Sequence, residues 1–227
     1  MNNRASSSIA AQIPETLRLA QQNRVLRNTY ALLALSLIPT IVGAYVASVF
    51  NFEAIFLAYP IAAPLGFFAL AIGMMFVVTA LRNSAWGIVA LFAFTFVFGF
   101  MVTPILTYAA SFSNGGQLIA LAAGMTATIF FVLAGIASTA KRDFSFMGKF
   151  LFAGLITVIL AAIANLFFQI PALSLTISCV AILLFSGYIL YDVNRIVRGG
   201  ETNYIMATMS IFISLYNLFV SLYCIFC

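Results

Sequence analysis

The stretch that decides the fold class is residues 171–226, PALSLTISCVAILLFSGYILYDVNRIVRGGETNYIMATMSIFISLYNLFVSLYCIF. It contains two apolar runs, at about 171–192 and 204–226, joined by a short connector that carries Arg195 and Arg198. Each run has the roughly 20 mostly apolar residues that an α-helix needs to cross a bilayer. The stretch therefore predicts two consecutive transmembrane helices with a basic turn between them.

Similar apolar runs occur upstream, at about 29–50, 54–80, 86–109, 117–140 and 149–169. Of the 227 residues, 64% are hydrophobic and 7% are charged, and the mean hydropathy is +1.15. A chain of this composition has too little polar surface to cover a water-soluble globule. We predict an all-α integral membrane protein with seven transmembrane helices in residues 29–227, preceded by a tail in residues 1–28.

The basic residues occur only in the tail and in the connectors after the second, fourth and sixth runs: Arg4, Arg18, Arg24, Arg27, Arg82, Lys141, Arg142, Lys149, Arg195 and Arg198. Basic connectors are retained on the cytoplasmic side of a membrane. The N-terminus is therefore predicted to be cytoplasmic and the C-terminus to lie on the opposite side. Topology and contact with membrane lipid account for the net charge of +5, and no basic stripe interleaved with aromatics suggests a nucleic-acid partner.

The N-terminal tail lacks the apolar core and the cleavage site of a signal peptide, so the first span is expected to remain as an anchor. Residues 1–13 are rich in Ser, Ala, Asn and Gln, a composition typical of disorder. From Pro14 onward the tail is expected to form a short helix that leads into the membrane.

The chain has few residues that carry out catalysis. It contains no histidine and only five Asp and Glu residues, which excludes a Ser-His-Asp triad and a His-ligated zinc site. It also lacks a phosphate-binding loop. We therefore expect no catalytic residue, no metal site and no cofactor. Cys224 and Cys227 form a C-x-x-C at the C-terminus, but nothing nearby would lower a thiol pKa, so a redox role is disfavoured.

Asp192 is the ionisable residue that borders or enters a span, and such residues are functional candidates by default. Arg195 follows three positions later on the same helix face and can pair with it. One interpretation is an interfacial ion pair. The other is a gate, in which the carboxylate blocks a pore in one protonation state and releases it in the other.

The seventh span carries a polar stripe at helical spacing, formed by Ser210, Ser214, Asn217 and Ser221. Such a stripe is expected to face other helices or water. Interhelical hydrogen bonding is the favoured interpretation, with Asn165 of the fifth span as a partner. Small residues in other spans predict close helix approach, among them Gly66, Ala69, Gly73, Gly124, Gly135 and Gly154, and Pro39, Pro60 and Pro64 predict kinks.

Several segments carry a family resemblance: RDFSFMG at 142–148, ILYD at 189–192, GGETNYI at 199–205 and SLYNLFVSL at 214–222. They resemble the Bax inhibitor family of multi-spanning membrane proteins, in particular its bacterial YccA-type members, which modulate FtsH protease. The resemblance runs from VLRNTY at 25–30 to the C-terminus. It implies six helices around a central C-terminal helix, a bacterial inner membrane location with a periplasmic C-terminus, and a non-catalytic inhibitor whose partner is the ATP-dependent protease FtsH.

The resemblance also implies an alternative, a pH-sensitive calcium or cation leak with Ca²⁺ or protons as permeant or regulatory ions. Leak-type members of the family hold a latch with one aspartate in the sixth span and another in the seventh. Asp192 matches the first aspartate, Ser214 occupies the second position, and Arg82 corresponds to the basic partner near the end of the second span. Because Ser214 is not a carboxylate, the two-carboxylate latch is incomplete, and the protease modulator is the first hypothesis.

Overall fold

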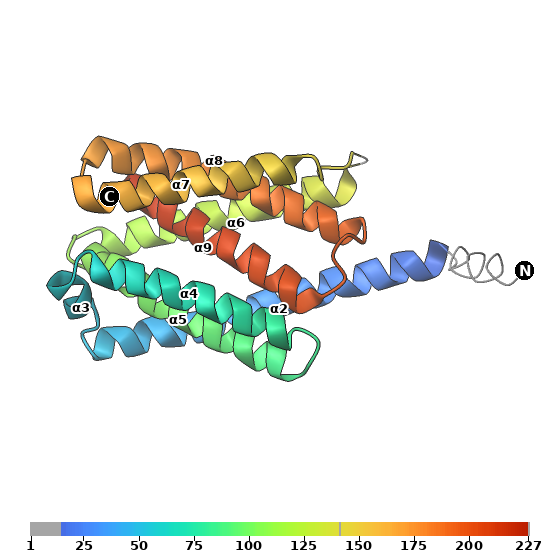
Figure 1. The fold of residues 1–227 in the computed structure, drawn as a ribbon, viewed down its shortest axis with the longest axis horizontal. Helices are drawn as coiled ribbons and strands as arrows, with labels where there is room; N and C mark the ends of the chain where they lie inside the picture. The colour runs from blue at the N-terminus through green and yellow to red at the C-terminus, as the bar shows by residue number, and fades with distance from the viewer. Residues whose placement is uncertain (1–14, 141, 227) are drawn as a thin grey trace, which may run out of the picture.

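A computed structural model of the chain describes residues 15–140 and 142–226, with side chains from residue 20 onward (Figure 1). The described residues form helices and no strand: α2 Glu15–Val49, α3 Glu53–Ala58, α4 Ala62–Leu81, α5 Trp86–Ala110, α6 Gly115–Thr139, α7 Met147–Phe168, α8 Pro171–Val197 and α9 Tyr204–Phe226. All but α3 are long and apolar enough to cross a membrane. The prediction of an all-α protein with seven membrane-length helices is confirmed. The tail over residues 1–13, Pro14, Lys141 and Cys227 lie outside the described residues.

Three helix boundaries differ from the predicted spans. Helix α2 is continuous from Glu15, so the end of the polar tail and the first span form one helix. The second span is two helices, because Pro60 has no amide hydrogen and disfavours helical geometry in the residue before it; Pro64 is tolerated in the first turn of α4. Helix α8 continues beyond the predicted end at 192 to Val197, which places Asp192 inside the helix.

Helix α9 runs obliquely between α6, α7 and α8 on one side and α2, α4 and α5 on the other (Figure 1). It contacts α2, α4, α5, α6 and α8, and α7 packs on α8. Much of α9 is buried, whereas Leu151 is the buried residue of α7 and Ala71 and Val78 are those of α4. Helices α4 and α7 are therefore the outer helices, with most of their surface available to lipid.

Helices α2 and α5 cross backbone to backbone at two glycines. A Cβ added at Gly43 would clash with the carbonyl oxygen of Phe96, and one added at Gly99 would clash with that of Thr40. Thr103 Oγ1 donates a hydrogen bond to the Ala44 carbonyl oxygen at 3.4 Å across the same crossing. Small residues allow close helix packing in lipid, and the bundle uses two of them at this crossing.

The predicted use of several other glycines is wrong. A Cβ added at Gly66, Gly73, Gly124 or Gly135 would meet no atom within 4 Å, because these glycines face away from the neighbouring helices. At Gly154 the prediction of close approach is confirmed, since an added Cβ would lie 2.8 Å from Leu184 Cδ1 of α8.

Candidate functional site

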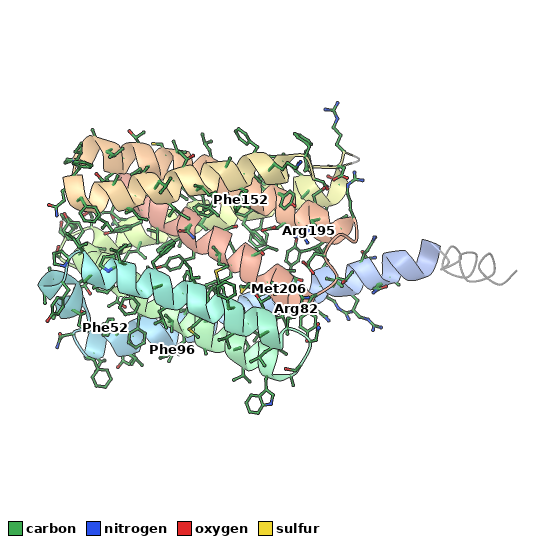
Figure 2. All side chains as sticks on the ribbon, viewed as in Figure 1. Phe52, Arg82, Phe96, Phe152, Arg195 and Met206 are labelled. Atoms are coloured by element: carbon green, nitrogen blue, oxygen red, sulfur yellow. The ribbon has the colours of Figure 1, made fainter. Side chains whose placement is uncertain are left out.

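The three basic connectors, residues 82–85, 140–146 without the undescribed Lys141, and 198–203, lie at one end of the bundle beside the N-terminal part of α2 (Figure 1). We call this the basic end. Asn203 joins two of the connectors, because its Nδ2 donates to the Arg82 carbonyl oxygen at 2.9 Å and to Asn83 Oδ1 at 3.1 Å. Figure 2 shows Arg82 and Arg195 at this end and Phe52 at the other, which we call the opposite end.

The connector between α8 and α9 is folded by its own hydrogen bonds. Gly199 adopts φ +76°, and the Gly200 amide donates to the Arg195 carbonyl oxygen at 2.8 Å. A left-handed glycine with this bond is a common way to end a helix. Glu201 Oε1 accepts from the amides of Thr202 at 3.0 Å and Asn203 at 2.9 Å. The connector thus has a defined conformation.

Asn203 also starts helix α9. Its Oδ1 accepts from the amides of Ile205 at 3.0 Å and Met206 at 3.1 Å, which satisfies two of the unpaired amides at the start of the helix. One side chain therefore fixes both the start of α9 and the position of the 82–85 connector.

Asn194 holds the third connector in place. Its side chain is 1% exposed; Oδ1 accepts from the Phe144 amide at 3.2 Å, and Nδ2 donates to the carbonyl oxygens of Ala137 at 3.4 Å and Arg142 at 3.3 Å. The bonds join α8 to the end of α6 and to the 140–146 connector. Neither Asn194 nor Asn203 was predicted as a site residue, although Asn203 lies within the GGETNYI segment and Asn194 lies two residues after ILYD.

Asp192 is 9% exposed and lies on the buried side of α8. Among the described residues, no hydrogen bond reaches its carboxylate, and the charges that act on it are those of Arg195 and Glu201. The predicted ion pair with Arg195 is not formed. Arg195 is exposed and turns to the connector instead, where Nη2 lies 3.5 Å from Glu201 Oε2 and Nε donates to the Gly200 carbonyl oxygen at 3.3 Å.

Arg82 is not brought to Asp192. Its backbone is held by Asn203, and its side chain is exposed, whereas Asp192 is buried. Ser214 is buried, and its Oγ donates to the Ser210 carbonyl oxygen at 3.1 Å within its own helix. The candidate gate residues therefore do not form one hydrogen-bonded cluster.

The polar stripe of α9 faces the interior of the bundle, since Ser214 and Ser221 are buried and Ser210 and Asn217 are half-buried. Asn217 Nδ2 donates to the Ile213 carbonyl oxygen at 2.8 Å, again within the helix. One hydrogen bond from α9 to another helix comes from a residue outside the stripe. It runs from Thr208 Oγ1 to the Thr29 carbonyl oxygen at 3.3 Å.

The predicted partner of the stripe, Asn165, lies elsewhere. Its Oδ1 accepts from the Ile170 amide at 3.0 Å and so closes the turn between α7 and α8. The partnership with the stripe is wrong because a side chain at the end of a helix satisfies the free backbone groups of its own turn. Within residues 15–140 and 142–226, no three His, Cys, Asp or Glu side chains lie together as metal ligands.

Comparison with known proteins gives the same family as the resemblance. The family described as "Inhibitor of apoptosis-promoting Bax1" matches residues 22–227. A membrane protein of Vibrio cholerae is 43% identical over 206 residues, which cover 90% of this chain and 89% of the other. Two Escherichia coli proteins, "Modulator of FtsH protease YccA" of strain K12 and "Inner membrane protein YccA" of strain CFT073, are each 42% identical over 205 residues, covering 90% of both chains. The chain belongs to the Bax inhibitor family.

Proposed function

We propose that this protein is a non-catalytic modulator of the bacterial inner membrane that restrains the ATP-dependent membrane protease FtsH. The observation that carries the proposal is the 42% identity, over 90% of both chains, to a protein named as a modulator of that protease. The name of the second Escherichia coli relative supports the inner membrane location.

The proposal includes an orientation and a central helix. The N-terminus and the basic end face the cytoplasm, the C-terminus faces the periplasm, and α9 is the central helix of the bundle. Three basic connectors at the same end support this orientation, because basic segments are retained on the cytoplasmic side. The contacts of α9 with α2, α4, α5, α6 and α8 support its central place.

A cytoplasmic basic end would face the unfolding machinery of the protease. Asn194 and Asn203 hold the connectors there in fixed positions, and the crossing of α2 with α5 is close. We propose that FtsH engages residues 1–13 of the tail while the packed bundle resists extraction, so that the protein occupies the path of other membrane substrates.

The test is reconstitution of purified FtsH in liposomes with a membrane substrate and ATP, with and without this protein. Slower loss of the substrate at an unchanged rate of ATP hydrolysis is the expected result. Unchanged substrate loss, with insertion of the protein verified, would contradict the proposal.

The role of the tail has a separate test. A variant without residues 1–13 is expected to bind FtsH as the full chain does but to escape degradation itself. Equal half-lives of the full and truncated chains would show that the tail is not the segment that the protease engages.

Asp192 supports a second candidate function, the pH-sensitive cation leak. A buried carboxylate with no hydrogen-bond donor among the described residues is costly to keep in an apolar bundle. We expect proteoliposomes of this protein to pass Ca²⁺ under this hypothesis, and Asp192→Asn to change the dependence of the flux on pH. Asp143→Asn, at an exposed carboxylate of the same end, is the matched control. A flux equal to that of empty liposomes would exclude the leak.

A further inference from the structure

A cavity of about 220 Å³ lies at the basic end, between the N-terminal part of α2 and the connector that follows α8. It is lined by Gln21, Gln22, Val25, Arg198, Gly199, Glu201 and Thr202. Its volume exceeds the share of several water molecules in the liquid, ~30 Å³ each. A phosphate group with a short aminoalkyl chain fits into a space of this size.

The lining carries one side chain of each charge, two amides and a hydroxyl, and Val25 is its one apolar side chain. Such a lining suits a small polar ligand with both a cationic and an anionic group. We propose that the cavity binds the headgroup of a zwitterionic phospholipid that bears a primary amine, with the phosphate toward Arg198 and the ammonium toward Glu201. This inference is independent of the action on FtsH.

The two charges of the lining have opposite signs. Arg198 supplies the cation and Glu201 the anion, and Arg195 pairs with Glu201 from outside the lining. A ligand that bears both a cation and an anion therefore complements the lining better than an anion alone does.

Both charged side chains of the lining have hydrogen-bonding capacity for a ligand. A guanidinium has five N–H donors, so Arg198 can bind a phosphate alongside a protein partner. Glu201 accepts two backbone amides at Oε1 and lies near Arg195 at Oε2. A carboxylate offers about four lone-pair sites, which leaves room for one ammonium hydrogen bond.

The depth of the cavity matches that of a headgroup. The apolar runs begin at about residue 29 in α2 and end at about residue 192 in α8. The lining residues therefore lie roughly one to two helical turns beyond these runs, where the apolar spans give way to the polar connectors. Gly199 contributes a wall without a side chain; an added Cβ would lie 2.9 Å from Gln22 Nε2.

The test is native mass spectrometry of the full chain in detergent, titrated with phosphatidylethanolamine, phosphatidylglycerol or water-soluble glycerophosphoethanolamine. We expect phosphatidylethanolamine to bind most tightly. Arg198→Gln should weaken that binding about tenfold, the effect of one lost charge-assisted hydrogen bond, and Thr202→Trp should abolish it by filling the cavity. Arg142→Gln and Ala85→Trp change exposed side chains of the same end outside the cavity and should bind as the unmodified chain does.

Three results would overturn the proposal. They are equal binding of phosphatidylglycerol, unchanged binding by Thr202→Trp, and binding of glycerophosphoethanolamine as tight as that of the lipid, which would assign the cavity to a soluble aminophosphate. Circular dichroism of each variant separates a loss of binding from a loss of fold.

Discussion

The two ends of the bundle are held together by different physical forces. At the basic end, side-chain hydrogen bonds from Asn194 and Asn203 join connectors that are far apart in the sequence. At the opposite end, the Phe52 ring packs edge-on against Phe67 and Phe100, with centroids 5.4 and 5.0 Å away, while Asn165 bonds only within its own turn.

The two kinds of contact differ in how precisely they fix the position of a connector. Hydrogen bonds are directional, so they set the position and the orientation of a connector, whereas ring contacts stabilise mainly by burying area. The bundle uses directional bonds at the end with the basic connectors, where a partner or a headgroup would recognise the shape of the surface. It uses apolar packing at the end for which the sequence predicts no partner.

Asn194→Ala is the substitution that we expect to destabilise the basic end most. It removes three hydrogen bonds of a fully buried side chain, which at ~0.5–1.5 kcal/mol each lowers the free energy of unfolding by roughly 2–4 kcal/mol. Denaturant unfolding in mixed micelles measures the change. Asn217→Ala, which removes one bond within α9, is the control, and an equal loss for both variants would contradict the special role of Asn194.

At the opposite end, Phe52→Ala is expected to lower the free energy of unfolding by about 2 kcal/mol, from lost apolar area and two ring contacts. Phe52→Leu should restore most of this stability, because an apolar side chain of similar size can fill the space. If the leucine variant were as unstable as the alanine variant, ring geometry rather than burial would hold this end together.

Asn203 gives the sharpest contrast with Phe52. Asn203→Ala is expected to cost roughly 1–2 kcal/mol through the lost helix cap and connector bonds, and Asn203→Leu should give no rescue. Asn203→Asp keeps an acceptor for α9 but loses both donors to the 82–85 connector. It should therefore unfold at nearly the normal denaturant concentration while limited proteolysis within 82–85 becomes faster. Unchanged proteolysis in the Asp variant would show that the Nδ2 bonds do not fix the connector.

The smallest expected change in stability comes from Asp143, which also lies at the basic end. Ser145 donates to Asp143 Oδ1 from its hydroxyl at 2.6 Å and from its amide at 2.9 Å, and these bonds lower the pKa of the Asp143 carboxyl below its usual value of 3.8. A lowered pKa in the folded state adds stability above pH 3.8, and that stability is lost as the pH falls further. Unfolding measured from pH 6 to pH 3 should show a slightly weaker acid dependence for Asp143→Asn than for the unmodified chain; a stronger dependence would contradict this sign.

The seven helices could be predicted because apolar length is a local property of the sequence, and the predicted span at 204–226 coincides with α9. The hydrogen-bonding and packing partners of individual side chains could not be predicted in this way. The spacing of Asp192 and Arg195 predicts that they share one helix face. In the structure the Asp192 side chain is buried inside the bundle, whereas the Arg195 side chain is exposed and pairs with Glu201 of the connector. Gly66 and Gly43 look alike in the sequence, and only the rotation of each helix decides which one meets a neighbour.

The crossing at Gly43 and Gly99 also determines how the bundle bears mechanical load. A pull on the N-terminal side of the chain reaches α2 before any other span, since α2 is the first helix that the structure describes. Sliding α2 along its axis would bring the Cβ atoms next to Gly43 against the α5 backbone, so the two helices must separate before either can move. The load on α2 is therefore shared with α5. Because α5 contacts α4 and α9, part of the load also passes to those two helices.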